Sequence, residues 1–328
     1  MDAILDIRGL RTWFDTPQGT AKVLDGLDLG IERGKIVGLV GESGSGKSVT
    51  AYSVMQLIRP PGRIVGGEIL FEGRDLLKLS EEEMREVRGN QIAMIFQDPR
   101  GFLDPVFRAG TVLAEIYRTH ERVNRQAARQ RAREMFRAVG LPAPERVMRS
   151  YPHELSGGMA QRVMIALALA CSPKLLIADE PTTALDVTVQ KQIIDLLGDL
   201  RERLGLTIIL ITHNLSLVAE ACDTVAVMYA GEIVELAPVR EIFEGPRHPY
   251  TVRLLEARPT FSPAERLAEI PGGVPDLLAP PTGCRFHPRC FLAEPVCSEK
   301  WPELREVGPD HRSRCHFAEL LEKREAIA

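Results

Sequence analysis

A glycine-rich segment carries the clearest chemistry of this sequence. Residues 41–48 read GESGSGKS, so four residues separate Gly41 from Gly46, and Lys47 and Ser48 follow directly. Glycines let the backbone amides turn toward a phosphate, and the N-terminus of a following helix adds positive potential there. Lys47 would then reach the β- and γ-phosphates, and Ser48 would ligate Mg²⁺. The predicted phosphate site comprises Gly41, Glu42, Ser43, Gly44, Ser45, Gly46, Lys47, Ser48 and Val49. The alternative is a surface loop that matches by chance, but an apolar strand pattern before it and a helical pattern after it favour the phosphate loop.

Two adjacent acids end another apolar run. The segment KLLIADE closes with Asp179, which can hold magnesium through water, and Glu180, which can orient an attacking water. His213 follows the apolar run at 207–212 and could contact the γ-phosphate or that water. Taken alone, the acids could be a solvated strand end and the histidine a structural residue, so their significance comes from occurring together with the phosphate loop.

The elements that must position these residues follow from the hydrophobic pattern. Short apolar runs predict strands at residues 35–40, 91–96, 174–179, 207–212 and 224–229, and several of these runs are separated by helical patterns. This alternation predicts an α/β fold with a largely parallel sheet. From about Gly110 to Gly140 the pattern is that of a charged, Arg-rich helix with no strand signal nearby, so we expect a helical insert at residues 99–171.

Composition excludes several classes of protein. The 328 residues carry a net charge of −4 with a pI of about 6.0, so the basic surface typical of nucleic-acid binding is missing and no nucleic-acid partner is expected. The longest apolar runs fall short of the roughly 18 to 20 residues that cross a bilayer. The N-terminus is acidic and has no long apolar stretch, which disfavours a signal peptide and predicts a cytoplasmic location.

Four of the six cysteines are concentrated near the C-terminus, after a Pro/Gly-rich segment at 271–283. They are spaced as Cys284-x5-Cys290-x6-Cys297-x17-Cys315. Four thiolates in a short, loop-rich segment can surround a metal centre, for which structural zinc is the default, although the spacing is wider than in zinc ribbons. Four unrelated buried thiols are the alternative. Nearby arginines would offset the charge of a thiolate cluster: Arg285, Arg289, Arg312 and Arg314. Cys171 and Cys222 are expected to be core residues.

A further motif identifies a resemblance. The segment LSGGMAQR at 155–162 resembles the signature sequence of ABC-type ATPases and precedes the Asp179–Glu180 strand, as in that family. Ser156 can cap the following helix, which leaves the amides of Gly157 and Gly158 as a second anion site. In the ABC family this site contacts the γ-phosphate of ATP held by a partner subunit, so the resemblance implies ATP between two ATPase subunits.

The resemblance also implies roles for other residues. Gln97, in FQDP, would ligate magnesium together with Ser48 and Asp179 and link it to the transporter. Glu180 would be the catalytic base, Asp186 in ALD (184–186) would lie at the subunit contact, and His213 would be the switch.

The resemblance also implies an aromatic contact with adenine. Phe14, or its neighbour Trp13, would stack on adenine, with an ordinary core aromatic as the alternative for Phe14.

Two residues depart from the family pattern. Met159 stands where glutamine is commonest in the signature, and Asn214 stands where aspartate usually follows the histidine. The first change keeps the Ser156 hydroxyl and the glycine amides, and the second removes a charge near the switch.

The C-terminal region resembles the extension of ATPase subunits from bacterial dipeptide and oligopeptide importers. The likeness rests on RHPYT (247–251), PGGVP (271–275), PPTGCRFHPRC (280–290) and the closing Cys315. It implies a 4Fe–4S cluster, structural or redox-sensing, with these ligands: Cys284, Cys290, Cys297 and Cys315.

Together the resemblances imply a P-loop ABC ATPase fold: a RecA-like core with an antiparallel β-subdomain and a helical subdomain. We expect an ABC domain over 1–245, with the helical insert at 99–171, and a Cys-rich extension over 246–328. The implied function is ATP hydrolysis that powers peptide import at the cytoplasmic face of the cell membrane. The implied partners are two transmembrane permease subunits, a paralogous ATPase subunit or a second copy of the chain, and, indirectly, a peptide-binding protein.

Two alternatives stay open. A soluble ABC ATPase acting on nucleic acid or ribosomes is disfavoured by the single phosphate loop, the short insert and the acidic pI. An importer of another cargo, such as nickel or glutathione, would use the same ATPase chemistry, because the ATPase does not contact the cargo.

Overall fold

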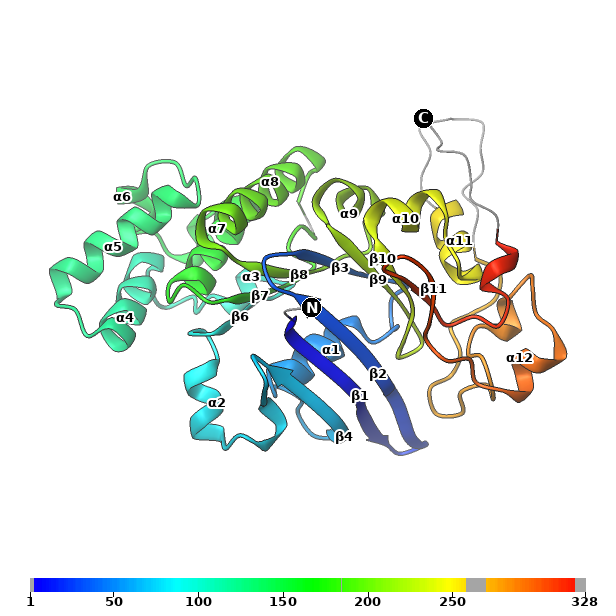
Figure 1. Cartoon of the computed structure of the whole chain (residues 1–328). Helices are drawn as coiled ribbons and strands as arrows, with labels where there is room; N and C mark the ends of the chain where they lie inside the picture. Colours follow the sequence, from blue (N-terminus) through cyan, green and yellow to red (C-terminus); the bar gives the residue numbers. More distant parts are fainter. Residues whose placement is uncertain (1–2, 184, 258–269, 322–328) are drawn as a thin grey trace. The chain divides into compact units, whose positions relative to one another are not determined.

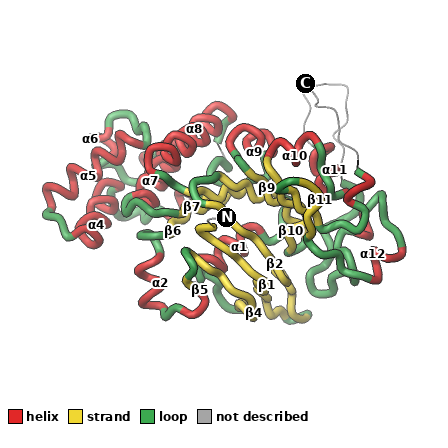
Figure 2. Tube along the Cα trace, in the orientation of Figure 1, coloured by secondary structure: helices red, strands yellow, loops and turns green. Residues whose placement is uncertain are grey.

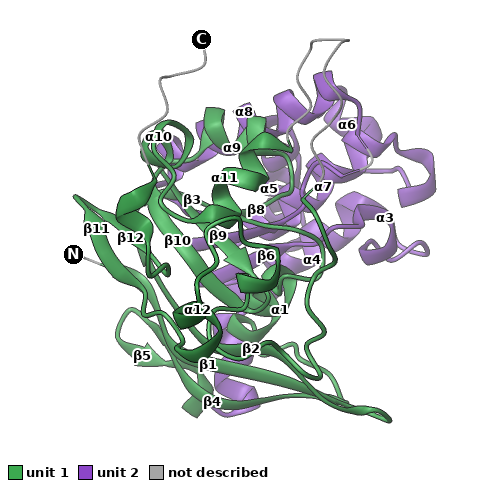
Figure 3. Ribbon diagram, turned by 90° about the vertical axis from the view of Figure 1, so that its right-hand side faces the viewer, with its two compact units in different colours: residues 1–78, 210–328 green, residues 79–209 purple. Residues whose placement is uncertain are grey.

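The computed structural model describes residues 3–183, 185–257 and 270–321, and Figures 1 and 2 label most of their helices and strands. The chain divides into two compact units (Figure 3). Unit 1 comprises residues 1–78 and 210–328, and unit 2 comprises residues 79–209. The domain boundary predicted at residue 245 separates two consecutive parts of the chain, whereas unit 1 combines residues 1–78 with residues 210–328. The predicted boundary is therefore not tested by these units and stays a prediction.

Unit 1 contains a four-stranded antiparallel sheet in the order β2-β1-β4-β5 (Figure 2). Leu27, Leu29 and Ile31 alternate with more exposed residues along β2, so one face of this strand packs into the core. The sheet is built from β1 (Ala3–Thr16), β2 (Gly19–Glu32), β4 (Gly62–Phe71) and β5 (Arg74–Asp75).

The other strands of unit 1 follow the order β11-β12-β10-β9-β3. β3 and β9 are parallel and consist almost entirely of buried residues, as expected for strands covered on both faces, whereas β10, β12 and β11 extend the sheet in antiparallel fashion. The bounds are β3 (Ile36–Val40), β9 (Thr224–Tyr229), β10 (Glu232–Pro238), β11 (Arg305–Gly308) and β12 (His311–Ser313). The helices are α1 (Lys47–Val54), α9 (Leu215–Ala221), α10 (Val239–Glu244), α11 (Pro249–Glu256) and α12 (Pro295–Glu299).

Unit 2 consists of helices and the parallel strand pair β6 (Ile92–Ile95) and β7 (Leu175–Asp179). Strand β8 (Thr207–Ile211) contains the boundary between the units. The helices are α2 (Glu81–Val87), α3 (Pro99–Phe102), α4 (Ala109–Glu121), α5 (Arg125–Ala138), α6 (Pro144–Val147), α7 (Gly157–Leu169) and α8 (Val187–Leu204). The five predicted strands are confirmed, and the described residues 99–171 form only helices and loops.

Local sequence explains these helices. Asn124 caps α5 by accepting a hydrogen bond from the amide of Ala127 at 2.9 Å, and Ala128, Ala132 and Phe136 bury one face of the helix at a spacing of four residues. The Arg-rich pattern of this segment therefore occupies the exposed side of an amphipathic helix.

The C-terminal segment is joined to β10 by a buried carboxylate. Glu235 is fully buried, and its Oε1 lies 2.7 Å from Nε2 of His311 on β12. Its two oxygens also accept hydrogen bonds from the amides of Arg247 and His248. One side chain thus connects β10, the start of α11 and the hairpin of β11 and β12, so these elements share one core within unit 1.

In the described ranges no helix combines the length and apolar character needed to cross a membrane.

Candidate nucleotide-binding site

The glycine-rich loop lies in unit 1 between the end of β3 and the start of α1, as predicted. Gly41 has φ +152°, and a Cβ at this position would lie 2.1 Å from the carbonyl oxygen of Met228. Gly46 has φ +107°, and its Cβ would lie 2.8 Å from Cε of Met228. Both positions therefore require glycine, because any side chain would be strained and would overlap β9.

Lys47 is directed onto the loop that precedes it. Its Nζ donates hydrogen bonds to the carbonyl oxygens of Gly41 and Glu42, at 2.8 and 2.9 Å, and to Oγ of Ser45 at 3.3 Å. The side chain is 7% exposed. An ammonium group is thus held within the loop, at the first residue of α1, which is the charge arrangement that an anion site needs.

His213 is also in unit 1 and follows β8. The amide of Thr212 donates to the carbonyl of Leu39 at 3.4 Å, so His213 emerges at the edge where β3 leads into the glycine-rich loop. His213 is exposed. Asn214 caps α9, accepting hydrogen bonds from the amides of Ser216 and Leu217. Aspartate, the residue expected here, caps helices in the same way, so the change keeps this local geometry.

The two candidate adenine residues lie next to each other on β1 and therefore point to opposite faces of the strand. Both side chains are partly exposed. Phe14 packs closely over Gly62, where a Cβ would lie 2.5 Å from Cε1 of the ring. Nζ of Lys22 lies 5.3 Å from the Trp13 ring centroid. Adenine stacking by either ring stays a prediction.

Unit 2 brings together the glutamine and the two acids predicted from the sequence. Because β6 and β7 are parallel, Gln97 and Asp179–Glu180 follow the same edge of the strand pair. Nε2 of Gln97 donates to Oε2 of Glu180 at 2.9 Å, and Oγ1 of Thr183 donates to the same oxygen at 2.7 Å. Asp179 is 1% exposed. Sequence reasoning missed Thr183, although its position three residues after Glu180 was a usable signal.

Glu180 has an unusual backbone conformation. Its φ is +47°, in the left-handed region that side chains other than glycine and asparagine rarely adopt. Such a conformation costs free energy and persists only where the surrounding structure maintains it. The turn between Asp179 and Thr183 therefore fixes the direction of the Glu180 carboxylate.

The signature segment forms a second site within unit 2. Oγ of Ser156 accepts a hydrogen bond from the amide of Met159 and caps α7, as predicted. Asp186 caps α8 through the amide of Val189 at 3.0 Å. A cavity of about 350 Å³ is lined by Ser156, Gly157, Gly158, Met159 and Asp186, among others. Two helix N-termini thus open onto one cavity; Ala184, in the predicted subunit contact, lies outside the described residues.

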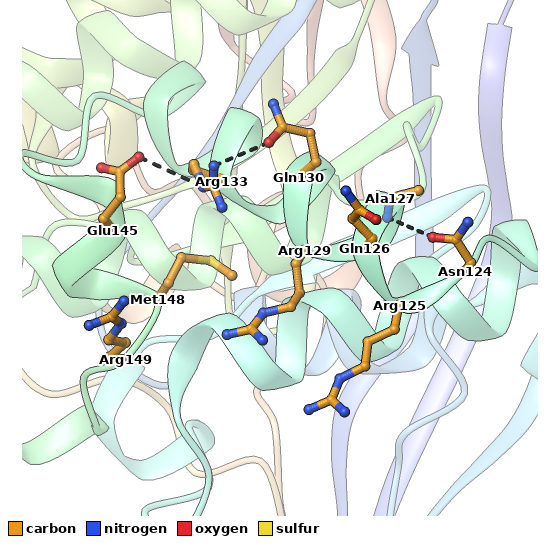
Figure 4. A pocket seen from close by; sticks show the side chains of 10 residues that line it. All are labelled: Asn124, Arg125, Gln126, Ala127, Arg129, Gln130, Arg133, Glu145, Met148 and Arg149. Carbon is orange, nitrogen blue, oxygen red and sulfur yellow. Dashed lines mark hydrogen bonds and ion pairs between the residues drawn. The ribbon is translucent and has the colours of Figure 1, made fainter.

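A larger cavity of unit 2 lies elsewhere. About 1000 Å³ in volume, it is bounded by α5 and the segment around Met148, and Figure 4 shows four arginines among its lining residues, Arg125, Arg129, Arg133 and Arg149. None of the residues predicted for the nucleotide site lines it, so cavity size alone would locate the site wrongly.

The four C-terminal cysteines line one small pocket, together with His248, Phe286, Leu292 and Phe317. All four are free thiols. The amides of Leu292 and Phe317 donate to the sulfur atoms of Cys290 and Cys315, at 3.3 and 3.4 Å. The fold therefore gathers thiols that are up to 31 residues apart in sequence, as the prediction required.

The pocket is not arranged as a site for a metal ion. Over the described residues, no group of three or more His, Cys, Asp or Glu side chains could hold one. Burial raises the pKa of Cys284 to about 12 and the pKa values of Cys290 and Cys315 to about 11, so these groups are neutral thiols at pH 7. The metal centre therefore stays a prediction.

The two other cysteines differ in burial. Cys222 is buried as expected, but Cys171 is only partly buried.

The arginines near the cysteines make their hydrogen bonds and ion pairs with groups other than sulfur, and the expectation that they offset thiolate charge stays a prediction. Arg285 pairs with Glu232 at 2.9 Å and Asp25 at 3.1 Å. Arg289 pairs with Glu42 and Arg312 with Glu306. Arg314 donates hydrogen bonds to the carbonyls of Ile233 and Pro302. A buried guanidinium needs acceptors for its N–H groups, and carboxylates and carbonyls supply them better than thiols.

Comparison with protein families assigns both parts of the chain. A model described as ABC transporter matches residues 24–183, which include the glycine-rich loop, Gln97, the signature segment and Glu180. A model described as oligopeptide/dipeptide transporter, C-terminal region, matches residues 234–297. A third model, described as an AAA domain and putative AbiEii toxin, matches residues 149–219, which overlap the first.

Individual proteins agree with this assignment. The chain is 52% identical to the probable peptide ABC transporter ATP-binding protein y4tR of Sinorhizobium fredii, over 96% of this chain and 95% of that protein. It is 49% identical to the oligopeptide transport ATP-binding protein OppD of Bacillus subtilis, over 94% and 87%. A solved dimer of the ATP-binding cassette MJ0796 with ADP and Pi covers 72% of this chain and 99% of that chain, with 27% identity and a TM-score of 0.65. This chain is an ABC-type ATPase and belongs to the family of ATP-binding subunits of the oligopeptide and dipeptide transporters.

Proposed function

We propose that this chain binds MgATP at residues 41–49 and hydrolyses it to power import of dipeptides or oligopeptides through a membrane transporter. The observation that carries the proposal is the glycine-rich loop itself. Its conformation requires glycine at Gly41 and Gly46, and it holds the Lys47 ammonium at the N-terminus of α1. This combination of glycine backbone, ammonium and helix N-terminus is specific for binding a phosphate chain.

Unit 2 supplies the groups for hydrolysis in this proposal. Magnesium, when bound, would neutralise charge on the phosphates, with Ser48, Gln97 and Asp179 as its ligands, directly or through water. Glu180 would take the proton of the attacking water. Support for this role comes from its two hydrogen bonds, from Gln97 and Thr183, which orient the carboxylate. His213 would respond to the γ-phosphate, and Phe14 or Trp13 would contact adenine.

The cavity at Ser156 supports a dimeric mechanism. Gly157 and Gly158 begin a helix capped by Ser156, so their amides can bind an anion. In this proposal the anion is the γ-phosphate of ATP bound to a second ATPase subunit, either a paralogue or a second copy of this chain, with Asp186 at the contact. A solved relative, the cassette MJ0796, forms a dimer with ADP and Pi.

The remaining partners follow from the proposed activity. The ATPase would dock on two transmembrane permease subunits at the cytoplasmic face of the membrane, and a peptide-binding protein would deliver the cargo to them. The domain division of 1–245 and 246–328, with the helical insert at 99–171, belongs to the same proposal. The names of the two curated relatives favour a peptide cargo over nickel or glutathione.

A pair of lysine variants tests the nucleotide site. Lys47→Ala should weaken ATP binding at least about tenfold, because it removes an ammonium that forms a charge-assisted contact with phosphate, worth roughly 1.5–3 kcal/mol. Lys191→Ala, on the exposed face of α8, is the matched control and should bind ATP normally. Both variants are compared with the wild type by titration with a fluorescent ATP analogue. Equal ATP affinity in all three proteins would remove residues 41–49 from the proposed site.

A further part of the proposal is a 4Fe–4S cluster held by Cys284, Cys290, Cys297 and Cys315. The number and type of the donors match such a cluster, whose usual ligands are four cysteines, and backbone amides already donate to two of the sulfurs, although the thiols as placed do not form a metal-ion site among the described residues. Bound iron would replace the thiol protons and so overcome the raised pKa values.

Anaerobic purification tests the cluster. About four iron and four sulfide per chain are expected, with loss of both in Cys290→Ser and retention in Cys171→Ser. Colourless protein that contains zinc, or no metal, would contradict the assignment.

A further inference from the structure

Glu42, the second residue of the glycine-rich loop, is held at three points. Its carboxylate accepts two hydrogen bonds from Arg289, at 2.8 and 3.1 Å. Its amide donates to the hydroxyl of Tyr250 at 2.8 Å, and its carbonyl accepts from Nζ of Lys47 at 2.9 Å. Two of these three contacts come from residues more than 200 positions away, in the C-terminal part of unit 1.

The Arg289 guanidinium is buried and has a hydrogen-bond partner for each of its N–H groups. Its side chain is 5% exposed. Besides Glu42, the guanidinium donates to the hydroxyl of Tyr229 at 3.2 Å and to the carbonyls of Pro271 and Ile270, at 2.8 and 3.2 Å. These bonds use all five N–H groups of the guanidinium, which fixes its plane and hence the position of the Glu42 carboxylate.

A cluster of rings makes this arrangement rigid. Tyr229 and Tyr250 are 1% and 0% exposed, and their ring centroids lie 4.6 Å apart. Phe286 packs against both, at 5.1 and 5.4 Å, and the Arg289 guanidinium lies 5.9 Å from its ring centroid. Such a packed core transmits displacements rather than absorbing them.

A second path links the same segment to the loop. Arg285 donates to the carbonyl of Ala230, and the amide of the next residue, Gly231, donates to the carbonyl of Ser45 at 2.8 Å. The region from 284 to 290 therefore contacts the glycine-rich loop directly at Glu42 and indirectly at Ser45.

We propose that the C-terminal extension positions the phosphate loop, with Arg289 and Tyr250 as positioning residues that act through Glu42. The inference rests on the proposed role of residues 41–49 in binding ATP. Arg289 has two effects. It fixes the Glu42 carbonyl that holds Lys47, and it neutralises a carboxylate that would otherwise repel the phosphate chain bound by the same loop.

The electrostatic effect predicts how the ATP affinity of a single variant differs from that of a double variant. Arg289→Gln leaves Glu42 as an uncompensated charge at the loop and should weaken ATP binding about tenfold, which corresponds to about 1.4 kcal/mol. Adding Glu42→Gln removes that charge and should restore the affinity to within about threefold of the wild type. A purely structural contact would not show this rescue, because the double variant lacks the ion pair as well.

The experiment uses the full chain with its C-terminal region and measures the Kd of a fluorescent ATP analogue, together with kcat and KM for ATP. KM should rise with the Kd in Arg289→Gln while kcat changes less than about threefold, because the contact acts on binding. Tyr250→Phe, which deletes only the hydroxyl, should weaken binding about threefold. Arg305→Gln is the matched control, since it breaks an exposed ion pair with Glu319 in the same extension and should leave the Kd unchanged.

Wild-type affinity in Arg289→Gln would overturn the proposal, and so would equal weakening in the single and double variants. If Arg289→Gln does not fold, Arg289→Lys keeps the charge but loses the two-point contact, and we expect about threefold weaker binding; an unchanged Kd would then be decisive against it. Lys47→Ala distinguishes failure of the proposed ATP site from failure of the proposed positioning role. Normal binding in Lys47→Ala rejects the ATP site itself, whereas weak binding there with normal binding in Arg289→Gln rejects only the positioning role.

Discussion

Replacement of Glu180 by glutamine isolates the chemical step from binding. The two side chains have the same shape, and the glutamine carbonyl oxygen can accept the hydrogen bonds that Gln97 and Thr183 now donate to Oε2 at 2.9 and 2.7 Å. The left-handed backbone at this position, with φ +47°, is equally strained for both residues. The amide, however, cannot take a proton from water.

The substitution has two effects, a loss of catalytic rate and a loss of folding stability, and they differ in size. Loss of a general base lowers kcat by about 10²–10⁴, or roughly 3–5 kcal/mol in the barrier. A hydrogen bond to a charged group is worth about 1 kcal/mol more than a neutral one, so two of them cost at most about 2 kcal/mol in folding stability. A loss of this size leaves most of the protein folded, because domains are stable by about 5–15 kcal/mol. Loss of stability alone therefore cannot account for a hundredfold loss of rate.

The assay measures phosphate release by the chain assembled with the proposed permease subunits, and ATP affinity by fluorescence. We expect kcat to fall at least about 100-fold while the Kd for ATP changes less than about threefold. Glu82→Gln, an exposed acid on α2, serves as the control and should hydrolyse ATP normally. A kcat within about tenfold of the wild type would refute the role of Glu180 as base, and a parallel loss of ATP binding would show that it is structural.

Three further predictions concern the fold around the site. Gly41→Ala should destabilise the protein by at least about 2 kcal/mol in denaturant unfolding, because its Cβ would overlap the carbonyl of Met228; a change below about 0.5 kcal/mol would contradict the loop geometry. Glu235→Gln should cost about 2–4 kcal/mol, since one amide oxygen cannot replace a carboxylate that accepts from three groups, and an unchanged unfolding midpoint would argue against the buried junction. Burial, together with the nearby charge of Arg314, lowers the pKa of His248 to about 3, so the unfolded chain takes up a proton below about pH 6.5 that the folded chain does not. Stability should therefore be fully present above pH 6.5 and fall by up to about 1.4 kcal/mol per pH unit as the pH drops toward 3. His248→Asn, which can still cap α11, should show a weaker dependence between pH 7.5 and 5.5, and an identical dependence would refute this assignment.

Some features of the protein are determined locally and could be predicted from the sequence. The glycine-rich loop, the cap at Ser156 and the acids that end β7 depend on neighbours within a few residues, because helix starts, tight turns and strand ends are short-range structures. Gln97 and Glu180 are 83 residues apart, and only the family resemblance assigned Gln97 to the same site as the acids, whereas the parallel pairing of β6 and β7 brings the two side chains together. The family resemblance supplied the roles that local geometry could not.

Other features appeared only in the tertiary structure. The sequence predicts that the arginines beside the cysteines balance thiolate charge, but it does not indicate their actual partners: Arg285 pairs with Asp25 and Arg289 with Glu42, which are 260 and 247 residues away. Cys171 is predicted to be a core residue but is partly exposed, because it follows the end of α7 rather than lying within the buried face of that helix.

The difference has a physical cause. A hydrogen bond or cap between near neighbours costs little chain entropy and leaves a pattern of residue types at fixed spacing. A contact such as that between Arg289 and Glu42 has no fixed spacing, and it forms only because β9, α11 and the C-terminal segment pack their aromatic rings into one core beside the glycine-rich loop. The sequence by itself therefore determined which residues can bind a phosphate chain, whereas the packing of distant segments decided which residues hold that loop in place.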